Sequence, residues 1–245
     1  MAKKTTTTTT VTTVVEDVPS TARKTYVALV LDRSSSMGAI RDQAISLFNE
    51  QLYTLQKAPE GAGDTFITLV TFASDVQVPI MSAKPSGVSP LNPQTYVPDG
   101  WTSMYDGMGR AINLLRSHDV QEGEDRAFLV ITITDGEENH STEFTGTRLS
   151  SLIRELKATG RWSFTVAGAN VNLDALADKL GIPKYNMYTF TSDAAGTYAA
   201  SASTSRGLGT YLDNRAMGEQ NVTTFYSKDD DTSVVADVPA DLETT

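Results

Sequence analysis

The segment YVALVLDRSSSM, residues 26–37, joins an unbroken apolar run to a cluster of short polar side chains. An apolar run without polar alternation is typical of a strand that is buried on both faces of a sheet. Beyond the polar cluster, apolar residues recur at helical spacing from Ile40 to Leu55, which predicts a helix. A buried strand followed by a loop and a helix is the unit from which parallel α/β sheets are built.

The same alternation of short apolar runs and helical patterns continues to about residue 212. Strands are predicted at 65–72, 76–80, 127–134, 163–167 and 187–190, and helices at 104–115, at 149–156, at 173–180 and after Asp193. The first two of these strands are separated by a short polar turn, which predicts a hairpin and one antiparallel edge strand. We therefore expect a doubly wound, Rossmann-like α/β fold, a three-layer sandwich with a mostly parallel sheet between helices.

The composition limits the possible classes of function. Lys and Arg number 20 against 30 Asp and Glu in 245 residues, and the formal net charge of −10 disfavours nucleic acid and anionic membranes as partners. The chain has no cysteine, so disulfides, thiolate metal sites and thiol catalysis are excluded. The apolar runs are too short to span a bilayer, and the basic start lacks the apolar stretch of a readable secretory signal.

Both ends of the chain differ from its middle. Residues 1–24 contain an unbroken Thr run at 5–10 with further Thr and Val, and we interpret them as a Thr-rich N-terminal tail. Such a tract has high β-propensity and can add as a strand to the sheet edge of a partner. Residues 222–245 are interpreted as an acidic C-terminal tail, with a net charge of −5 over residues 228–245. One domain, residues 25–221, lies between the two tails.

Oxygen-bearing side chains follow the first predicted strand at every second position. Asp32, Ser34 and Ser36 are spaced so that a tight loop can turn their oxygens toward one point. Carboxylate and hydroxyl oxygens are hard ligands, which suit Mg²⁺, Mn²⁺ or Ca²⁺. Taken alone, such residues are more often N-caps of the following helix than metal ligands.

Two more loops carry hard oxygens at the same end of the predicted sheet. Asp135 follows the strand 127–134, and Thr102 precedes the helix 104–115. Each loop alone is explained by ordinary turn chemistry. Ligands of doubly wound sheets bind outside the carboxyl ends of the strands, so three such loops together predict a metal site there.

In these three loops the sequence resembles the von Willebrand factor A domain. The DxSxS motif of that family corresponds to residues 32–36, its threonine loop to residues 100–106 and its aspartate loop to residues 134–136. The resemblance covers about residues 25–212 and implies a metal-ion-dependent adhesion site. The implied metal-binding residues are Asp32, Ser34, Ser36, Thr102 and Asp135. In the family the hydroxyls usually ligate directly, while the aspartates often act through bound water.

Four further residues near these motifs are candidates for supporting the ligands or lining the rim of the site. Asp106 resembles a residue that orients the threonine from behind, although the helix dipole alone also favours an acid in a first turn. Trp101, where many members of the family have Gly, either anchors a partner or packs under the proline-rich loop before it. Glu137 and Glu138 either line the rim or form a solvated loop edge.

An enzymatic role is not expected. An aspartyl-phosphate phosphatase also places an acid at the end of its first strand, but it needs a second acid where this chain has Ser34. A serine hydrolase needs a G-x-S-x-G turn, which is absent, and neither His118 nor His140 stands in the context of a catalytic triad. No Gly-rich phosphate loop follows any predicted strand.

The expected function is therefore binding of a protein partner that supplies an Asp or Glu to a bound Mg²⁺, Mn²⁺ or Ca²⁺ ion. The alternative is a structural component of a larger assembly, such as a phage virion, that is docked by its tails with the metal site secondary. The lack of a readable secretory signal and of cysteine suits a location in the bacterial cytoplasm or in a virion.

Overall fold

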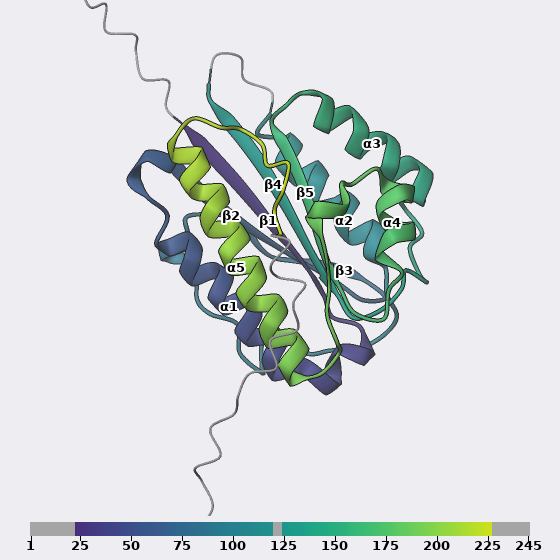
Figure 1. Cartoon of the computed structure of the whole chain (residues 1–245). Helices are drawn as coiled ribbons and strands as arrows, with labels where there is room; N and C mark the ends of the chain where they lie inside the picture. The colour runs from purple at the N-terminus through teal and green to yellow at the C-terminus, as the bar shows by residue number, and fades with distance from the viewer. Residues whose placement is uncertain (1–22, 120–123, 227–245) are drawn as a thin grey trace, which may run out of the picture.

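Six strands form one sheet in the order β3-β2-β1-β4-β5-β6 in the computed structural model, which describes residues 23–119 and 124–226 (Figure 1). The strands are β1 (Lys24–Asp32), β2 (Asp64–Phe72), β3 (Val76–Ala83), β4 (Arg126–Thr134), β5 (Trp162–Gly168) and β6 (Met187–Thr189). All neighbouring strands are parallel except β2 and β3, which form the predicted hairpin at one edge. The predicted fold class is thus confirmed.

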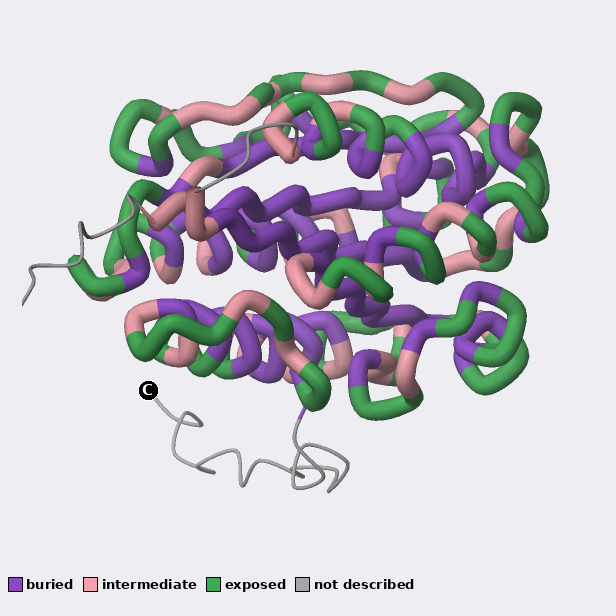
Figure 2. The backbone as a smooth tube through the Cα atoms, turned by 90° about the horizontal axis from the view of Figure 1, so that it is seen from above, coloured by how far each residue is buried: buried purple, intermediate pink, exposed green. Residues whose placement is uncertain are grey.

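Helices cover both faces of the sheet. They are α1 (Arg41–Gln56), α2 (Met104–Arg116), α3 (Gly146–Ala158), α4 (Leu173–Leu180) and α5 (Ala194–Ala216), with short 3₁₀ turns at Ser35–Ile40, Glu60–Ala62, Pro85–Gly87 and Lys184–Asn186. Helices α1 and α5 lie on one face, and α2, α3 and α4 lie on the other (Figure 1). Figure 2 shows the buried strands between these two helical layers. No helix among the described residues is long and apolar enough to cross a membrane.

The sheet separates two apolar cores. Val27 and Leu29 of β1 enter the core beneath α1 and α5, whereas Ala28 and Val30 enter the core beneath the other three helices. All four side chains are buried. Because neither face of β1 meets water, this strand shows no polar alternation in its sequence.

The central pair of strands positions the site. From β1 the chain passes through α1 to β2 on one side, whereas β4 pairs with the other side of β1. Helix α1 lies on one face of the sheet and α3, which follows β4, lies on the opposite face (Figure 1). After β1 and β4 the chain therefore continues toward opposite faces of the sheet. Doubly wound sheets bind their ligands between two such strands.

The C-terminal boundary of the domain differs from the predicted one. Residues 222–226 were assigned to the acidic tail, but Phe225 and Tyr226 are buried against the core beneath α5. The backbone N–H of Val222 donates to Ser163 Oγ at 2.8 Å, and that of Phe225 donates to Asn186 Oδ1 at 3.0 Å. Two aromatic side chains give this segment the apolar area that the rest of the proposed tail lacks. The remaining tail residues, 1–22 and 227–245, lie outside the described part of the chain.

Candidate metal centre

The loop after β1 is tied to the neighbouring loops by its backbone. The N–H of Arg33 donates to the carbonyl oxygen of Phe72 at 2.7 Å, and the N–H of Asp99 donates to the carbonyl oxygen of Arg33 at 2.8 Å. The N–H of Ser35 donates to the carbonyl oxygen of Gly100 at 3.0 Å. The DxSxS loop and the threonine loop therefore share one hydrogen-bonded framework.

Gly100 allows the threonine loop to approach the β2–β3 hairpin. Its φ of +84° lies in the left-handed region, and a Cβ there would stand 2.5 Å from Ser74 Oγ. The next residue, Trp101, donates its backbone N–H to the same Ser74 Oγ at 2.9 Å. A side chain at position 100 would displace the loop that carries Thr102.

Hydroxyl and carboxylate oxygens from two separate loops are in direct contact. Ser34 Oγ lies 3.1 Å from Ser36 Oγ, and Ser36 Oγ donates to Asp135 Oδ1 at 2.6 Å. Ser36 and Asp135 are 99 positions apart in the chain. The DxSxS loop and the aspartate loop thus present three oxygen-bearing side chains as one connected cluster.

The Asp32 carboxylate is buried and held by two donors. Its Oδ1 accepts the backbone N–H of Ser34 at 2.7 Å, and its Oδ2 accepts the hydroxyl of Thr134 at 2.5 Å. Burial raises the pKa of the Asp32 carboxyl to about 6, although both hydrogen bonds act in the opposite direction. A buried acid of this kind gains from a nearby cation, which favours its charged form.

Thr102 is placed by reciprocal bonds with a residue of the aspartate loop. Its backbone N–H donates to Asn139 Oδ1 at 3.0 Å, and the backbone N–H of Asn139 donates to its carbonyl oxygen at 3.0 Å. A Cβ at Gly136 would lie 3.6 Å from Thr102 Oγ1 and 3.9 Å from Ser36 Oγ. Gly136 therefore lies close to both hydroxyls.

The structure thus brings together the five residues named from the sequence. Three neutral hydroxyls and two carboxylates form a hard oxygen set, which fits Mg²⁺ or Mn²⁺. Among the described residues no cluster of three or more His, Cys, Asp or Glu is present, so a site built only from those side chains is not available there. The donor set is therefore the mixed hydroxyl and carboxylate type that the motifs predict.

The hydrogen bonds of the Asp106 side chain go to the loop before α3. Its Oδ1 accepts the backbone N–H groups of Glu143 at 3.0 Å and Phe144 at 2.7 Å, and its Oδ2 accepts that of Thr142 at 2.8 Å. The side chain therefore holds the loop before α3. A role in orienting the threonine from behind stays a prediction.

Glu138 is half-buried and is tied to its own loop and to α2 by hydrogen bonds. Its Oε1 accepts the backbone N–H groups of His140 and Ser141, and its Oε2 accepts that of Tyr105 at 2.8 Å and the hydroxyl of Ser141 at 2.7 Å. This carboxylate joins the aspartate loop to the first turn of α2. Glu137, by contrast, is exposed.

Trp101 stands at the surface and is not packed under the proline-rich loop. Its side chain is 63% exposed, although it is the largest apolar side chain near the site. The indole stacks on the exposed His140 ring, with the ring centroids 6.4 Å apart. Of the two interpretations left open by the sequence, the structure favours an exposed contact residue beside Thr102.

The other histidine lies at the opposite end of the sheet. His118 Nε2 is 2.8 Å from Ser82 Oγ, and its ring stacks on Tyr26. Burial and the charges of Arg126 and Lys24 lower the pKa of His118, and no carboxylate among the described residues orients the ring. Among the described residues this serine and histidine pair has no third member of a catalytic triad.

Sequence reasoning missed several residues that support the site. Ser192, at the start of α5, donates its hydroxyl to Asp135 Oδ2 at 3.2 Å, and Asn170 Nδ2 donates to the Asp135 carbonyl oxygen at 3.3 Å. Tyr96 donates its hydroxyl to the Asp32 carbonyl oxygen at 2.5 Å. None of these lies in a motif, and only the fold brings them near.

Fold and site together define a doubly wound α/β domain with an oxygen-lined site at the switch point of its sheet. The model of the von Willebrand factor type A domain family matches residues 27–202, and the chain belongs to this family. The family resemblance drawn from the three motifs is thereby confirmed. No curated protein matches the sequence.

Solved structures similar to this chain come from several organisms. The PilB minor pilin of Streptococcus sanguinis is 12% identical over 80% of this chain and 63% of its own, with a TM-score of 0.52. The manganese-loaded TRAP protein of Plasmodium vivax is 18% identical over 70% of each chain, with a TM-score of 0.49. Proximal thread matrix protein 1 of the mussel byssus, with a zinc-occupied MIDAS motif, is 20% identical over 80% of this chain, with a TM-score of 0.49. The match covers only 46% of the mussel chain, and at these identities the likeness shows the fold alone.

Proposed function

We propose that this protein is a divalent-metal-dependent protein-binding domain. The metal is held by Asp32, Ser34, Ser36, Thr102 and Asp135. The observation that carries the proposal is the contact of Ser36 Oγ with Asp135 Oδ1, because it joins the two loops that supply four of the five residues. A hydroxyl and a carboxylate at hydrogen-bond distance can turn toward a common cation without movement of the backbone.

The charge of the site suits a divalent ion that keeps an open position. Two carboxylates balance a charge of +2, and the three hydroxyls add ligands without adding charge. A bound Mg²⁺ or Mn²⁺ supplies an electrophilic coordination position that an Asp or Glu of a partner can fill. Thr102 Oγ1 and Ser36 Oγ both lie close to Gly136, so we place the approach of such a carboxylate beside these three residues.

The proposed role is one of interaction, as is general for von Willebrand factor A domains. A protein with a net charge of −10 repels acidic partners over most of its surface. A bound cation makes the surface charge positive at one point. This point determines where an acidic side chain of a partner can approach. The exposed Trp101 beside this point supplies apolar contact area for the same partner.

Calorimetry of metal binding tests the site. The wild-type chain should bind Mg²⁺ or Mn²⁺ with one site, and Asp32→Ala should lose that binding. Glu137→Gln serves as the matched control, because Glu137 is an exposed acid near the site and is not a proposed ligand. Unchanged Mg²⁺ affinity in Asp32→Ala would overturn the assignment.

Affinity capture in Mg²⁺ and in EDTA tests the partner. Proteins retained by the wild-type chain in Mg²⁺ should elute in EDTA and should be absent from Asp32→Ala eluates. If EDTA does not change the retention of a partner, the metal takes no part in the interaction. The alternative role, a component of a phage virion or other assembly docked by its tails, remains a proposal, as does a location in the bacterial cytoplasm or virion.

A further inference from the structure

One edge of the sheet is unpaired among the described residues. Strand β6 ends the sheet, and it pairs only with β5. The backbone N–H of Phe190 donates to the Gly168 carbonyl oxygen at 3.1 Å, so residues 188 and 190 turn their backbone groups toward β5. The N–H and carbonyl of Thr189, which lies between them, therefore point away from the sheet. Such groups form the template for an added strand.

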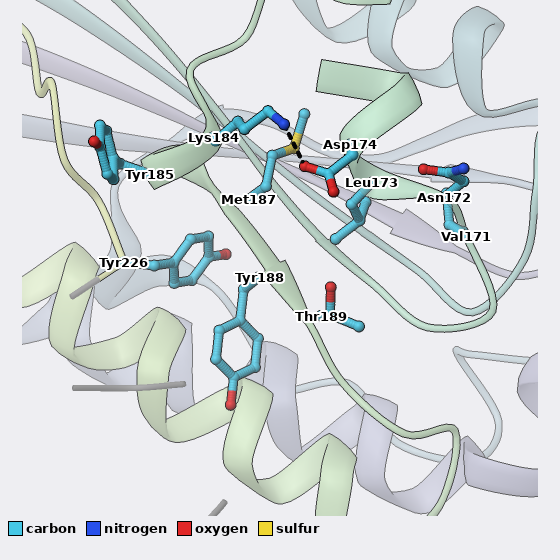
Figure 3. A pocket seen from close by; sticks show the side chains of 10 residues that line it. All are labelled: Val171, Asn172, Leu173, Asp174, Lys184, Tyr185, Met187, Tyr188, Thr189 and Tyr226. Carbon is cyan, nitrogen blue, oxygen red and sulfur yellow. Dashed lines mark ion pairs between the residues drawn. The ribbon is translucent and has the colours of Figure 1, made fainter. Parts of the chain in front are cut away.

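A groove runs along this edge. It has a volume of about 390 Å³ and is lined from both faces of the sheet (Figure 3). Figure 3 shows Leu173 and Asp174 of α4 on one side of β6, and the rings of Tyr188 and Tyr226 on the other. An extended peptide bound at a sheet edge sends alternate side chains to opposite faces, so it needs space on both sides of the strand. The β6 groove has this shape.

The opposite edge of the sheet is protected against strand addition. Strand β3 contains Pro79, which lacks a backbone N–H, and its pairing with β2 is broken by register shifts. Ser82 adopts a φ of +44° in this irregular stretch. Proline and bulges are the usual devices that prevent edge pairing. Strand β6 has neither proline nor a bulge, and among the residues that the structure describes only its short length protects it.

The charges of the groove favour an uncharged segment. Lys184 Nζ pairs with Asp174 Oδ1 at 2.7 Å, and in the described part of the chain these are the only charged residues that line the groove. The lining therefore offers no free positive charge to the acidic residues 228–245. Residues 5–15 contain only Thr and Val, follow Lys3 and Lys4, and have the β-branched composition of a strand.

Within one copy, residues 219–226 lie between Arg23 and β6. Arg23 is held at Gly61 and Ala216 by hydrogen bonds from its guanidinium, on the α5 side of the sheet. Residues 219–226 cross the N-terminal ends of β4 and β5, where Asn221 donates to the Gly160 carbonyl oxygen at 2.7 Å (Figure 1). A segment that comes from a second copy need not cross residues 219–226.

We propose that residues 5–15 of one copy of this chain add as a strand to the β6 edge of a second copy. Each copy carries one segment and one groove, so the contact can repeat from copy to copy. Few backbone bonds are available at a three-residue strand, so the association should be weak and should depend on protein concentration. This inference does not rest on the metal site.

Cysteine cross-linking tests the location, because the natural chain contains no cysteine. Each mixture contains two variants of the full chain that carry different tags. One is Thr189→Cys, and the other is Thr9→Cys or Thr10→Cys. The mixture is then oxidised. Thr9 and Thr10 face opposite sides of an extended strand, so one of them should reach the groove. The control partner is Gln77→Cys, on the exposed edge strand β3. Mixed adducts should form about tenfold more with Thr189→Cys than with Gln77→Cys, owing to the local concentration of the docked segment. Equal yields at the two edges would overturn the proposal.

Sedimentation velocity of the full chain provides the second test. The wild-type sedimentation coefficient should rise with concentration, and Thr189→Pro, which removes the outward N–H, should abolish the rise. Thr189→Ala keeps that N–H and should associate like the wild type. Val11→Pro lies in the segment itself, so it tests the same contact without touching the domain. A wild-type chain that stays monomeric, or association that survives both proline variants, would contradict the inference. The results should be the same in Mg²⁺ and EDTA, which separates this contact from the proposed metal-dependent function.

Discussion

The hydroxyl of Ser36 donates to the carboxylate of Asp135 at 2.6 Å, although the two residues are 99 positions apart in the chain. Parallel pairing of β1 with β4 produces this contact, because Leu31 stands opposite Ile133 and the two strands end side by side. Each loop then begins at the same edge of the sheet. Strand register therefore brings together the loops of the proposed site.

Removal of the Ser36 hydroxyl should weaken metal binding. Ser36→Ala deletes one proposed ligand and the donor that positions Asp135, so the affinity for Mg²⁺ should fall by about tenfold or more. Isothermal titration calorimetry measures the change. Ser35→Ala is the matched control, since Ser35 contacts the neighbouring loop only through its backbone N–H. Equal losses in the two variants would point to a general disturbance of the loop.

Metal binding should stabilise the folded chain. At a free Mg²⁺ concentration of 100 times Kd, binding contributes about 2.7 kcal/mol, which raises the melting temperature by about 5–10 °C. Removal of the ion with EDTA should reverse the rise, as followed by differential scanning calorimetry. A wild-type melting temperature that does not change when millimolar Mg²⁺ is added would contradict a specific site.

Asp32→Asn should abolish this thermal shift without destabilising the metal-free protein. The amide oxygen can still accept the N–H of Ser34, and the Thr134 hydroxyl can donate instead to the Gly136 carbonyl oxygen, 3.0 Å away. Replacing a buried carboxylate also removes the cost of burying its charge. The metal-free variant should therefore melt at or above the metal-free wild type.

Asn139 should matter for metal binding although it is not a proposed ligand. It holds Thr102 through its side chain and its backbone, so Asn139→Ala should lower metal affinity by about tenfold, as is usual for residues that orient metal ligands. The same calorimetric titration compares this variant with Glu137→Gln, a nearby change that breaks no recorded hydrogen bond. An Asn139→Ala chain with wild-type affinity would show that the loop contact does not place the threonine.

Asp125 should be important for stability far from the metal site. The buried guanidinium of Arg215 bonds Asp125 Oδ1 at 3.0 Å, and Arg23 bonds its Oδ2 at 2.7 Å. Asp125→Ala leaves Arg215 buried without its acid, which should cost about 3–5 kcal/mol in urea unfolding. The exposed pair of Lys84 and Asp64 gives the comparison, since Asp64→Ala should cost about 1 kcal/mol or less. Similar costs in the two variants would contradict this account.

The Phe225 side chain should stabilise the domain although it lies in a segment that the sequence assigned to a tail. It is 4% exposed and packs against Gly207 of α5, where a Cβ would stand 2.6 Å from the ring. Phe225→Ala should therefore cost about 3 kcal/mol or more in unfolding free energy. Thr224 is exposed, so Thr224→Ala should change the free energy of unfolding little. A Phe225→Ala variant as stable as the wild type would show that these residues do not belong to the folded domain.

Much of the fold follows from local patterns. Residues 26–31 are apolar throughout because β1 is buried on both faces, and the short turn at 73–75 predicts the one antiparallel pair. The end of the domain could not be predicted in this way. Phe225 and Tyr226 follow a polar stretch, and they are buried only because α5 and β6 present a surface for them.

The candidate site could likewise be predicted only in part. The two-residue spacing of Asp32, Ser34 and Ser36 and the motifs around Thr102 and Asp135 are local features, so the sequence alone determined the fold family and named all five proposed ligands. Only the tertiary structure decided which side chains support them. Asp106 turned out to hold the loop before α3, while Asn139 and Ser192 hold Thr102 and Asp135. The physical reason is that a hydrogen bond between distant loops depends on strand register and helix packing, which no local pattern of residues records.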